Sequence, residues 1–264
     1  MNQFNNPTCV EIDANDTMYI CDHHNYRVQM WTKGATTGIK IIDTTGADHP
    51  EALTFDKNKY LYLTGHNVHR VIRFPPDYSS FAIVAGVSAT ASAALNDLDN
   101  PLGMDVDNNL NLYIAERDNK RVMKWAPNAT SGTIVIGTAS TPKFYGLLLS
   151  LYTTDQAYVS SQDADAVYLW TFNASLPTVT LTQVNASTST LNEPRGIEYD
   201  TYGNLYVTDT KNKRVVMYCV NSTMGRVAIA DSTLNLPHDV AFDSNLNMYV
   251  VDYNNHQVVR YTRL

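Results

Sequence analysis

Two sets of side chains in the sequence are of the types that bind ligands or transfer protons, and both recur at fixed places in repeated segments. The first set directly follows the residue that opens a segment, and the second set lies further along the segment. The first set contains Glu51, Tyr145, Arg195 and His238, and the second contains His23, Arg117, Lys211 and Tyr253. Imidazole, carboxylate and guanidinium groups can hold a ligand or a metal, or act as acids and bases, if the fold brings them together.

The charge and composition of the chain argue against several classes of protein. Its 264 residues contain 19 Lys and Arg against 26 Asp and Glu, a formal net charge of −7. Nucleic-acid backbones are bound through many basic side chains, so we predict that nucleic acid is not the partner. No stretch approaches the ~20 apolar residues of a spanning helix, and we predict no membrane span. Because no G-x-S-x-G, H-E-x-x-H or phosphate-loop motif occurs, we predict neither a cofactor nor a resident metal.

The cysteines do not form a recognisable set. Cys9, Cys21 and Cys219 are odd in number and include no C-x-x-C pair. We therefore predict neither a disulfide framework nor a zinc site, and we expect stability to come from packing.

Six copies of one segment cover the chain, which is typical of repeat architectures. Most copies open on a proline, continue with an apolar-x-apolar-Asp run, and then contain a tyrosine that is followed twelve residues later by a second aromatic residue. The copies open at Pro7, Pro50, Pro101, Phe144, Pro194 and Pro237. The tyrosines are Tyr19, Tyr62, Tyr113, Tyr158, Tyr206 and Tyr249, and the later aromatics are Trp31, Phe74, Trp125, Trp170, Tyr218 and Tyr261.

Apolar and polar residues alternate within each copy, which predicts strands and no helix. In the first copy the four expected strands cover residues 10–13, 18–21, 27–31 and 38–42. A small sheet with two apolar faces is buried only between neighbours, so we predict an all-β, six-bladed β-propeller of four-stranded antiparallel blades over residues 1–264. The sixth copy ends after its third strand. Either Asn2 to Asn5 supply a fourth strand, or this blade is incomplete, or the domain is excised from a longer protein, which we favour.

These segments resemble the NHL-repeat propellers. The matching residues include Pro194-Arg195-Gly196-Ile197, Asn204-Leu205-Tyr206-Val207-Thr208-Asp209 and Asn212-Lys213-Arg214-Val215, and the third copy from Pro101 to Trp125 matches similarly. The resemblance covers essentially the whole chain and implies the same six-bladed fold. It implies no particular function, because the motif residues hold the blade together and one fold hosts many functions.

The resemblance includes one enzyme, the peptidylglycine amidating lyase, in which channel-facing histidines hold zinc. Pro237 to Val240 resembles one of its ligand segments, but the equivalent position holds a histidine in no other copy, so a three-histidine set is missing. We interpret His66 and His69 as surface residues. A channel calcium, as in lactonase-type propellers, is a further alternative, although the recurring aspartates suit hairpin turns; they are Asp13, Asp56, Asp107, Asp200 and Asp243.

An acidic residue in the first strand of the odd copies is followed sixteen residues later by an arginine. The pairs are Glu11 and Arg27, Asp105 and Arg121, and Glu198 and Arg214. We predict that each pair forms a structural ion pair on a buried blade face, where losing one partner costs ~3–5 kcal/mol.

The two sets of candidate residues vary between copies and are expected on one face of the disc, which is typical of a binding surface. We favour a monomeric, non-catalytic module that recognises a protein, peptide or glycan there. The first alternative is a metal-dependent lyase or hydrolase at the channel mouth, and the second is an RNA-binding propeller. Three sequons in equivalent turns, at Asn128, Asn173 and Asn221, favour an extracellular glycoprotein.

Overall fold

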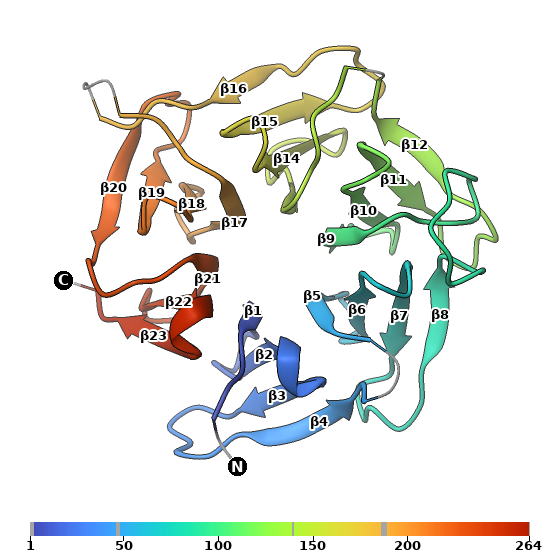
Figure 1. Ribbon diagram of the computed structural model, residues 1–264, viewed down its shortest axis with the longest axis horizontal. Helices are drawn as coiled ribbons and strands as arrows, with labels where there is room; N and C mark the ends of the chain where they lie inside the picture. Colours follow the sequence, from blue (N-terminus) through green and yellow to red (C-terminus); the bar gives the residue numbers. More distant parts are fainter. Residues whose placement is uncertain (1–2, 46–47, 139, 186–188, 264) are drawn as a thin grey trace.

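The computed structural model describes residues 3–45, 48–138, 140–185 and 189–263. In this part of the chain six antiparallel sheets stand radially around one axis (Figure 1). Strands that follow one another in the chain are neighbours in each sheet, so every blade is a meander. The first strand of a blade lies closest to the axis and the fourth lies at the rim (Figure 1).

The first three blades have four strands each. Their bounds are β1 Pro7–Ile12, β2 Met18–Asp22, β3 Arg27–Trp31 and β4 Ile39–Asp43; β5 Pro50–Phe55, β6 Leu61–Gly65, β7 Arg70–Phe74 and β8 Ala82–Ala85; β9 Pro101–Val106, β10 Leu112–Glu116, β11 Arg121–Trp125 and β12 Thr133–Ile136. The strands predicted for the first copy agree with β1 to β4 to within a few residues.

The fourth and fifth blades also have four strands, and the sixth has three. Their bounds are β13 Leu147–Leu149, β14 Gln156–Ser161, β15 Ala166–Thr171 and β16 Val179–Leu181; β17 Pro194–Tyr199, β18 Leu205–Asp209, β19 Arg214–Tyr218 and β20 Gly225–Ala230; β21 Pro237–Phe242, β22 Met248–Asp252 and β23 Gln257–Tyr261. Short 3-10 helices, η1 His23–Asn25 and η2 Tyr253–Asn255, join β2 to β3 and β22 to β23. No helix in the described residues is long and apolar enough to cross a membrane. The predicted six-bladed, all-β fold is confirmed, with an incomplete last blade.

The apolar core lies between neighbouring blades. One cluster combines Cys21 and Val28 of the first blade with Leu53, Leu61 and Leu63 of the second, and each of these side chains is at most 6% exposed. Because alternate side chains of a strand point to opposite faces, each blade offers one apolar column to each neighbour. A blade is therefore buried only because the next blade covers it.

The ring closes through packing and side-chain hydrogen bonds between the first and sixth blades. The described residues include no strand before β1, and Asn2, part of the expected fourth strand, lies outside them. The Val10 N–H donates to the Asp239 carboxylate (3.0 Å), and the Ser244 N–H and hydroxyl donate to Asp16 (2.7 and 2.8 Å). These contacts join blades that share no sheet.

The recurring tyrosines and aspartates act together at the hairpin between the first two strands of a blade. In blade 3 the Asp107 carboxylate accepts the N–H groups of Asn109 (2.9 Å) and Asn111 (2.8 Å), and the Tyr113 hydroxyl donates to its second oxygen (3.3 Å). Asp56 with Tyr62 and Asp243 with Tyr249 repeat this geometry. The turn role expected for these aspartates is therefore observed.

Cys9 and Cys21 form a disulfide, so the prediction that these cysteines would not pair was wrong. The two residues lie directly opposite each other in the β1–β2 ladder, with Cα atoms 5.0 Å apart. Sequence spacing alone did not reveal this cross-strand register. Cys219 is a free cysteine.

We expect the double variant Cys9→Ala/Cys21→Ala to lose about 2–3 kcal/mol of unfolding free energy, because the bridge closes a short loop in the unfolded chain. Urea unfolding of the variant and of the oxidised wild type measures the difference. Reducing the wild type should lower its midpoint comparably. Equal midpoints for the oxidised and reduced wild type would contradict the prediction.

The arginines of the odd blades form ion pairs, but the predicted acidic partners were wrong. The Nε atom of each arginine lies next to a carboxylate oxygen at the end of the adjacent second strand: Arg27 with Asp22 (2.7 Å), Arg121 with Glu116 (2.5 Å), and Arg214 with Asp209 (2.6 Å). The predicted partners Glu11, Asp105 and Glu198 lie on innermost strands instead.

Strand register explains the error. In blade 3, Tyr113 of β10 is paired with Asp105 on one side and with Lys124 on the other. Arg121 is paired with Glu116, at the opposite end of β10. Asp105 and Arg121 therefore lie on strands either side of β10 and next to its opposite ends, so they do not meet.

The three equivalent sequons lie in turns between the third and fourth strands. Asn128, Asn173 and Asn221 are exposed and have left-handed backbone φ angles of 60°, 65° and 61°. Asparagine tolerates this conformation well, which accounts for its recurrence. The sequon at Asn185 continues into residues 186–188, outside the described residues. Glycosylation stays a prediction.

Candidate functional site

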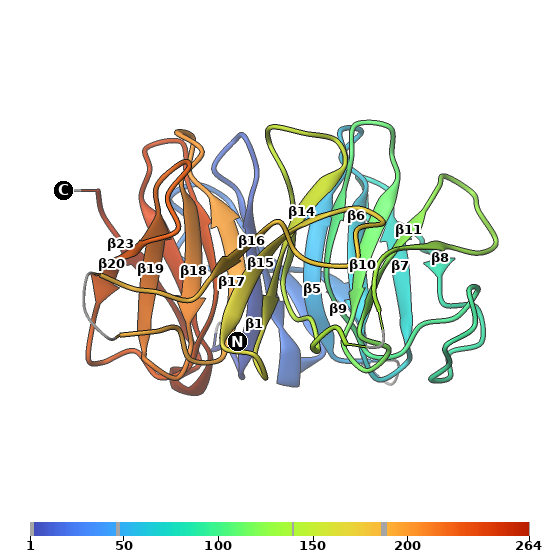
Figure 2. The ribbon, with the colours of Figure 1, turned by 90° about the horizontal axis from the view of Figure 1, so that it is seen from above.

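The loops that lead into the innermost strands and the loops between the second and third strands share one face of the disc. Backbone hydrogen bonds join them: the Arg117 N–H donates to the Asn100 carbonyl (3.1 Å), and the Lys211 N–H donates to the Asn192 carbonyl (3.2 Å). Figure 2 views the disc from the side, with loops gathered at its two faces. The loops that carry the two predicted sets of residues therefore lie on the same face of the disc, as predicted.

Glu51, the second residue of innermost strand β5, lines the cavity that opens at this face and is only 8% exposed. One of its carboxylate oxygens accepts a hydrogen bond from the Tyr145 hydroxyl (2.6 Å). The other oxygen lies 3.1 Å from Nδ1 of His23 and 3.7 Å from Nδ1 of His66. This carboxylate thus joins side chains from blades 1, 2 and 4.

A chain of polar and aromatic groups continues from Tyr145 to blades 5 and 6. The Arg195 guanidinium lies over the Tyr145 ring, with its carbon 4.9 Å from the ring centroid, and it also contacts the imidazole of His238. The His238 ring stacks on Tyr253 with centroids 4.0 Å apart and planes 8° from parallel. The mouth of the channel is therefore lined by one continuous network.

Burial and neighbouring charges fix the protonation of this network. Burial alone would raise the pKa of Glu51, but the His23 hydrogen bond and the charges of His23 and His66 hold it well below its ordinary value. Burial and the Glu51 charge raise the pKa of Tyr145, and burial and the Arg195 charge lower that of His238. The mouth thus contains an ionised carboxylate, a protonated phenol and a neutral imidazole.

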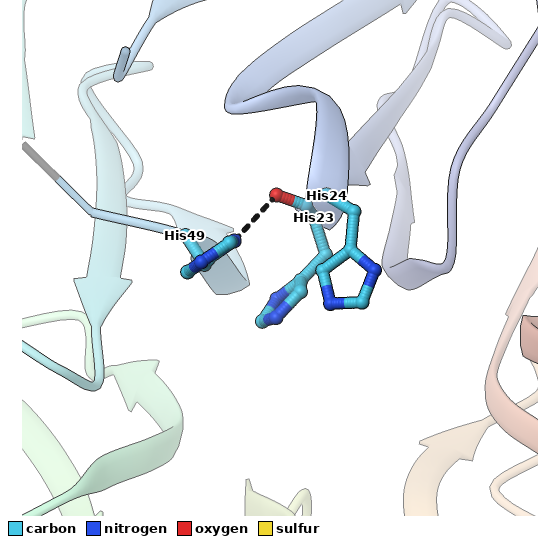
Figure 3. Close-up of side chains that lie close together, drawn as sticks. All are labelled: His23, His24 and His49. Carbon is cyan, nitrogen blue, oxygen red and sulfur yellow. Dashed lines mark hydrogen bonds between the residues drawn. The ribbon is translucent and has the colours of Figure 1, made fainter. Parts of the chain in front are cut away.

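Histidines from the first two blades gather beside Glu51. Figure 3 shows His23 and His24, from η1, next to His49, whose Nδ1 lies 3.0 Å from the carbonyl oxygen of His23. The rings of His23 and His49 are stacked with centroids 4.5 Å apart, and the His66 ring is 5.5 Å from that of His23 and 7° from parallel to it. Imidazoles this close can hold a metal ion or transfer a proton.

A cavity of about 270 Å³ extends from this mouth along the axis. Its lining includes five carboxyl groups, from Glu11, Glu51, Asp105, Glu198 and Asp239. Burial raises the pKa of Asp105 to about 6, that of Asp239 to about 7 and that of Glu198 to about 8. Burial and the other three inner acids also raise the pKa of Glu11 well above its ordinary value.

Two of the predicted binding residues lie apart from this network. Arg117 is 3.7 Å from Asp118, and Lys211 is 3.8 Å from Glu193. Both cations occupy the same kind of loop as His23 and Tyr253, but they have exposed acidic partners of their own. The structure brings together the other six predicted residues, namely Glu51, Tyr145, Arg195, His238, His23 and Tyr253.

Sequence reasoning missed His49, and it misassigned the acids of the channel. His49 precedes Pro50, so its position next to the opening residue of the second copy was the signal that could have found it. The sequence predicts Glu11, Asp105 and Glu198 on buried blade faces as partners of arginines. In the structure they line the axial cavity instead. His66, expected at the surface, has a side chain only 23% exposed and faces Glu51.

Comparisons with known proteins agree with this architecture. The family model of the NHL repeat matches residues 234–261, which cover the last copy and the three residues before it. A search of curated proteins found no match. Similar solved structures include virginiamycin B lyase from Staphylococcus aureus, with 10% identity, 99% of this chain and 86% of that chain covered, and a TM-score of 0.69.

Two other similar structures have different roles. A gluconolactonase from Xanthomonas campestris is 13% identical over 94% of this chain and 84% of its own, with a TM-score of 0.74. A chain of the nidogen–laminin complex is 15% identical over 84% of this chain and 85% of its own, with a TM-score of 0.63. At such low identity these likenesses establish the fold alone, and they include both enzymes and a binding protein. The chain is a six-bladed β-propeller that carries an NHL repeat in its last blade.

Proposed function

We propose that this propeller is a non-catalytic recognition module that binds a basic side chain of a peptide or protein in its channel. The observation that carries the proposal is the group of inner acids, Glu11, Asp105, Glu198 and Asp239, around one cavity. Among the described residues no lysine, arginine or histidine forms an ion pair with any of these four. Burial raises the pKa of each of these acids, and a cationic group entering the channel would stabilise their ionised form.

The size and rim of the channel support a side chain as the ligand. A cavity of about 270 Å³ lies just below the range of pockets for drug-sized molecules but accommodates a lysine or arginine side chain. At the rim, the partly exposed ring of Tyr253, which stacks on buried His238, offers an aromatic surface against which peptide groups can pack. The formal net charge of −7 argues against RNA, whose phosphates are bound through many basic side chains.

The binding test compares peptides that contain lysine or arginine with matched peptides that contain glutamine or citrulline. Calorimetry should detect binding of the basic peptides only, and Glu198→Gln or Asp105→Asn should weaken it about tenfold, or 1.4 kcal/mol, because each removes a carboxylate next to the bound cation. Glu193→Gln, which changes an acid outside the channel, is the matched control. Equal binding of the neutral peptides, or unchanged affinity in both channel variants, would refute the proposal.

A metal-dependent lyase or hydrolase at the same mouth is the second candidate function. Two observations favour it: the fold is shared with a lyase and a lactonase, and nitrogen and oxygen donors of His23, Glu51 and His66 lie together at the mouth. A zinc- or calcium-dependent turnover of ester or lactone substrates by the purified protein would favour this candidate over pure recognition.

The Cys9–Cys21 disulfide supports an extracellular location as part of the proposal. Disulfides persist in oxidising compartments and are rare in the cytosol of most organisms. The exposed sequons at Asn128, Asn173 and Asn221 suit the same environment. Expression in a secretory host followed by mass measurement of the intact chain would detect attached glycans.

A further inference from the structure

Three potential metal ligands from two neighbouring blades meet at the mouth of the channel. His23 comes from η1 of the first blade, Glu51 is the second residue of β5, and His66 lies in the loop between β6 and β7. One donor atom from each lies within 4.8 Å of the other two. The group is therefore assembled by packing of blades 1 and 2 and not by any contiguous sequence motif.

The distances within the group suit a small tetrahedral ion. Bonds of 2.0–2.1 Å to zinc place two tetrahedral ligand atoms about 3.3 Å apart. The Glu51 oxygen that faces the histidines is 3.1 Å from Nδ1 of His23 and 3.7 Å from Nδ1 of His66. The two imidazole planes are only 7° from parallel, so one ring must rotate about its side-chain bonds before both nitrogens can point at a shared ion.

His66 has an unused donor atom. Its Nδ1 is buried and has no hydrogen-bond partner among the described residues. An orphaned buried polar atom costs free energy, and a metal ion would satisfy its lone pair. His23 Nδ1 lies 3.1 Å from both the Pro50 carbonyl and Glu51, and both are acceptors, so this nitrogen carries a proton that a metal ion would replace.

The surroundings hold the ligands in place. Oε1 of Glu51 accepts a hydrogen bond from the Tyr145 hydroxyl at 2.6 Å, while Oε2 faces the two histidines. His49 stacks on His23, and its Nδ1 lies 3.0 Å from the His23 carbonyl. Such outer partners fix the orientation of metal ligands and tune the affinity of a site.

We propose that His23, Glu51 and His66 bind one divalent transition-metal ion, with zinc as the best fit. Two imidazoles and one carboxylate suit zinc, cobalt or nickel, whereas calcium and magnesium prefer sites made entirely of oxygen. Three protein ligands would leave a fourth tetrahedral position for water or a substrate atom. This site shares Glu51 with the lining of the channel but uses none of the four inner acids, and it rests on the second candidate function and not on peptide recognition.

The experiment uses the whole chain, stripped with EDTA and titrated with zinc against a chromophoric chelator. We expect one zinc ion per chain. His66→Ala should weaken its binding at least about a hundredfold, because a two-ligand remnant is a poor zinc site. Cobalt substitution should give the visible absorption of a tetrahedral site, and His66→Ala should abolish it.

Two control histidines make the assignment specific. His69→Ala changes a neighbouring histidine that lies 3.6 Å from Asp99, and it should leave zinc affinity unchanged. His24→Ala tests the competing group His23, His24 and His49, whose donor atoms are also within 4.8 Å of one another. His66→Gln preserves most of the side-chain volume, so it should lose zinc while melting in EDTA like the wild type.

Less than stoichiometric zinc on the wild-type chain would overturn the proposal, as would zinc binding that survives in both His66 variants. Loss of zinc in His24→Ala with normal binding in His66→Gln would also overturn it, because the ion would then belong to the other histidine group. Peptide binding is measured separately in EDTA, so a failure of the metal site and a failure of the recognition function give different results.

Discussion

Replacing Arg121 by alanine is expected to lower the free energy of unfolding by about 3–5 kcal/mol, because it leaves the Glu116 carboxylate buried without its ionic partner. Glu116 is fully buried and Arg121 is 6% exposed, and the two are joined by a contact of 2.5 Å. Burial raises the pKa of Glu116 and the arginine opposes that rise, so removing the arginine makes ionised Glu116 still less favourable.

Arg121 also holds the loop that leads into blade 3. Its guanidinium donates to the carbonyls of Ala93 (2.8 Å) and Ala94 (3.2 Å). On the other side of the pair, Glu116 accepts the backbone N–H of Asp99 (2.8 Å). We therefore expect residues 87–100 to lose protection from proteolysis in Arg121→Ala, in addition to the loss of global stability.

Denaturant unfolding of Arg121→Ala, Glu116→Ala and the double variant forms a cycle that isolates the pair. The double variant should be less destabilised than the sum of the single variants, since it leaves no unpaired buried charge. Arg117→Ala, which removes an exposed arginine of the same blade, should change stability by no more than about 0.5 kcal/mol. A similar small effect for Arg121→Ala would show that the ion pair is not structural.

The sequence revealed the fold because each recurring residue type has a local role. The recurring tyrosine marks a hairpin whose turn aspartate it hydrogen-bonds, as Tyr113 does with Asp107. The recurring proline marks the start of an innermost strand. Residues with such local roles recur at the same place in every copy and are therefore visible in the sequence. Six copies with two apolar faces each can be buried only by packing side by side around an axis.

Partners across strands were less predictable. Whether Arg121 meets Asp105 or Glu116 depends on strand register, which a count of intervening residues does not give. The disulfide between Cys9 and Cys21 escaped notice for the same reason. The convergence of Glu51, Tyr145 and His238 was predicted in outline, because all three follow the opening residue of a copy. The contribution of His49 and His66 depends on how blades 1 and 2 are rotated against each other.

The channel acids should make the protein less stable as the pH rises from about 5 to about 8, because they bind protons more tightly in the folded state than in the unfolded state. Buried His238, whose pKa is lowered, acts in the opposite direction below its ordinary pKa of 6.5. The pKa of Glu198 is raised from 4.5 to about 8, and those of Asp239 and Asp105 are raised to about 7 and about 6, chiefly by burial. Where the folded state holds more protons than the unfolded state, the free energy of unfolding falls with pH. The loss begins above the unfolded pKa values and ends once the folded groups have ionised.

Glu198→Gln removes the largest of these three shifts without changing the size of the side chain. At pH 8.5 we expect it to raise the free energy of unfolding by about 2–4 kcal/mol relative to wild type, since one pKa unit corresponds to 1.36 kcal/mol and water in the channel screens part of the effect. At pH 4.5 the protonated Glu198 resembles glutamine, so the two proteins should melt alike. Glu193→Gln, in an exposed loop, should follow the wild type at both pH values. A Glu198→Gln variant that is no more stable than the wild type at pH 8.5 would mean that the Glu198 carboxylate already has a compensating partner within the fold, which would also remove a basis for binding a cationic ligand there.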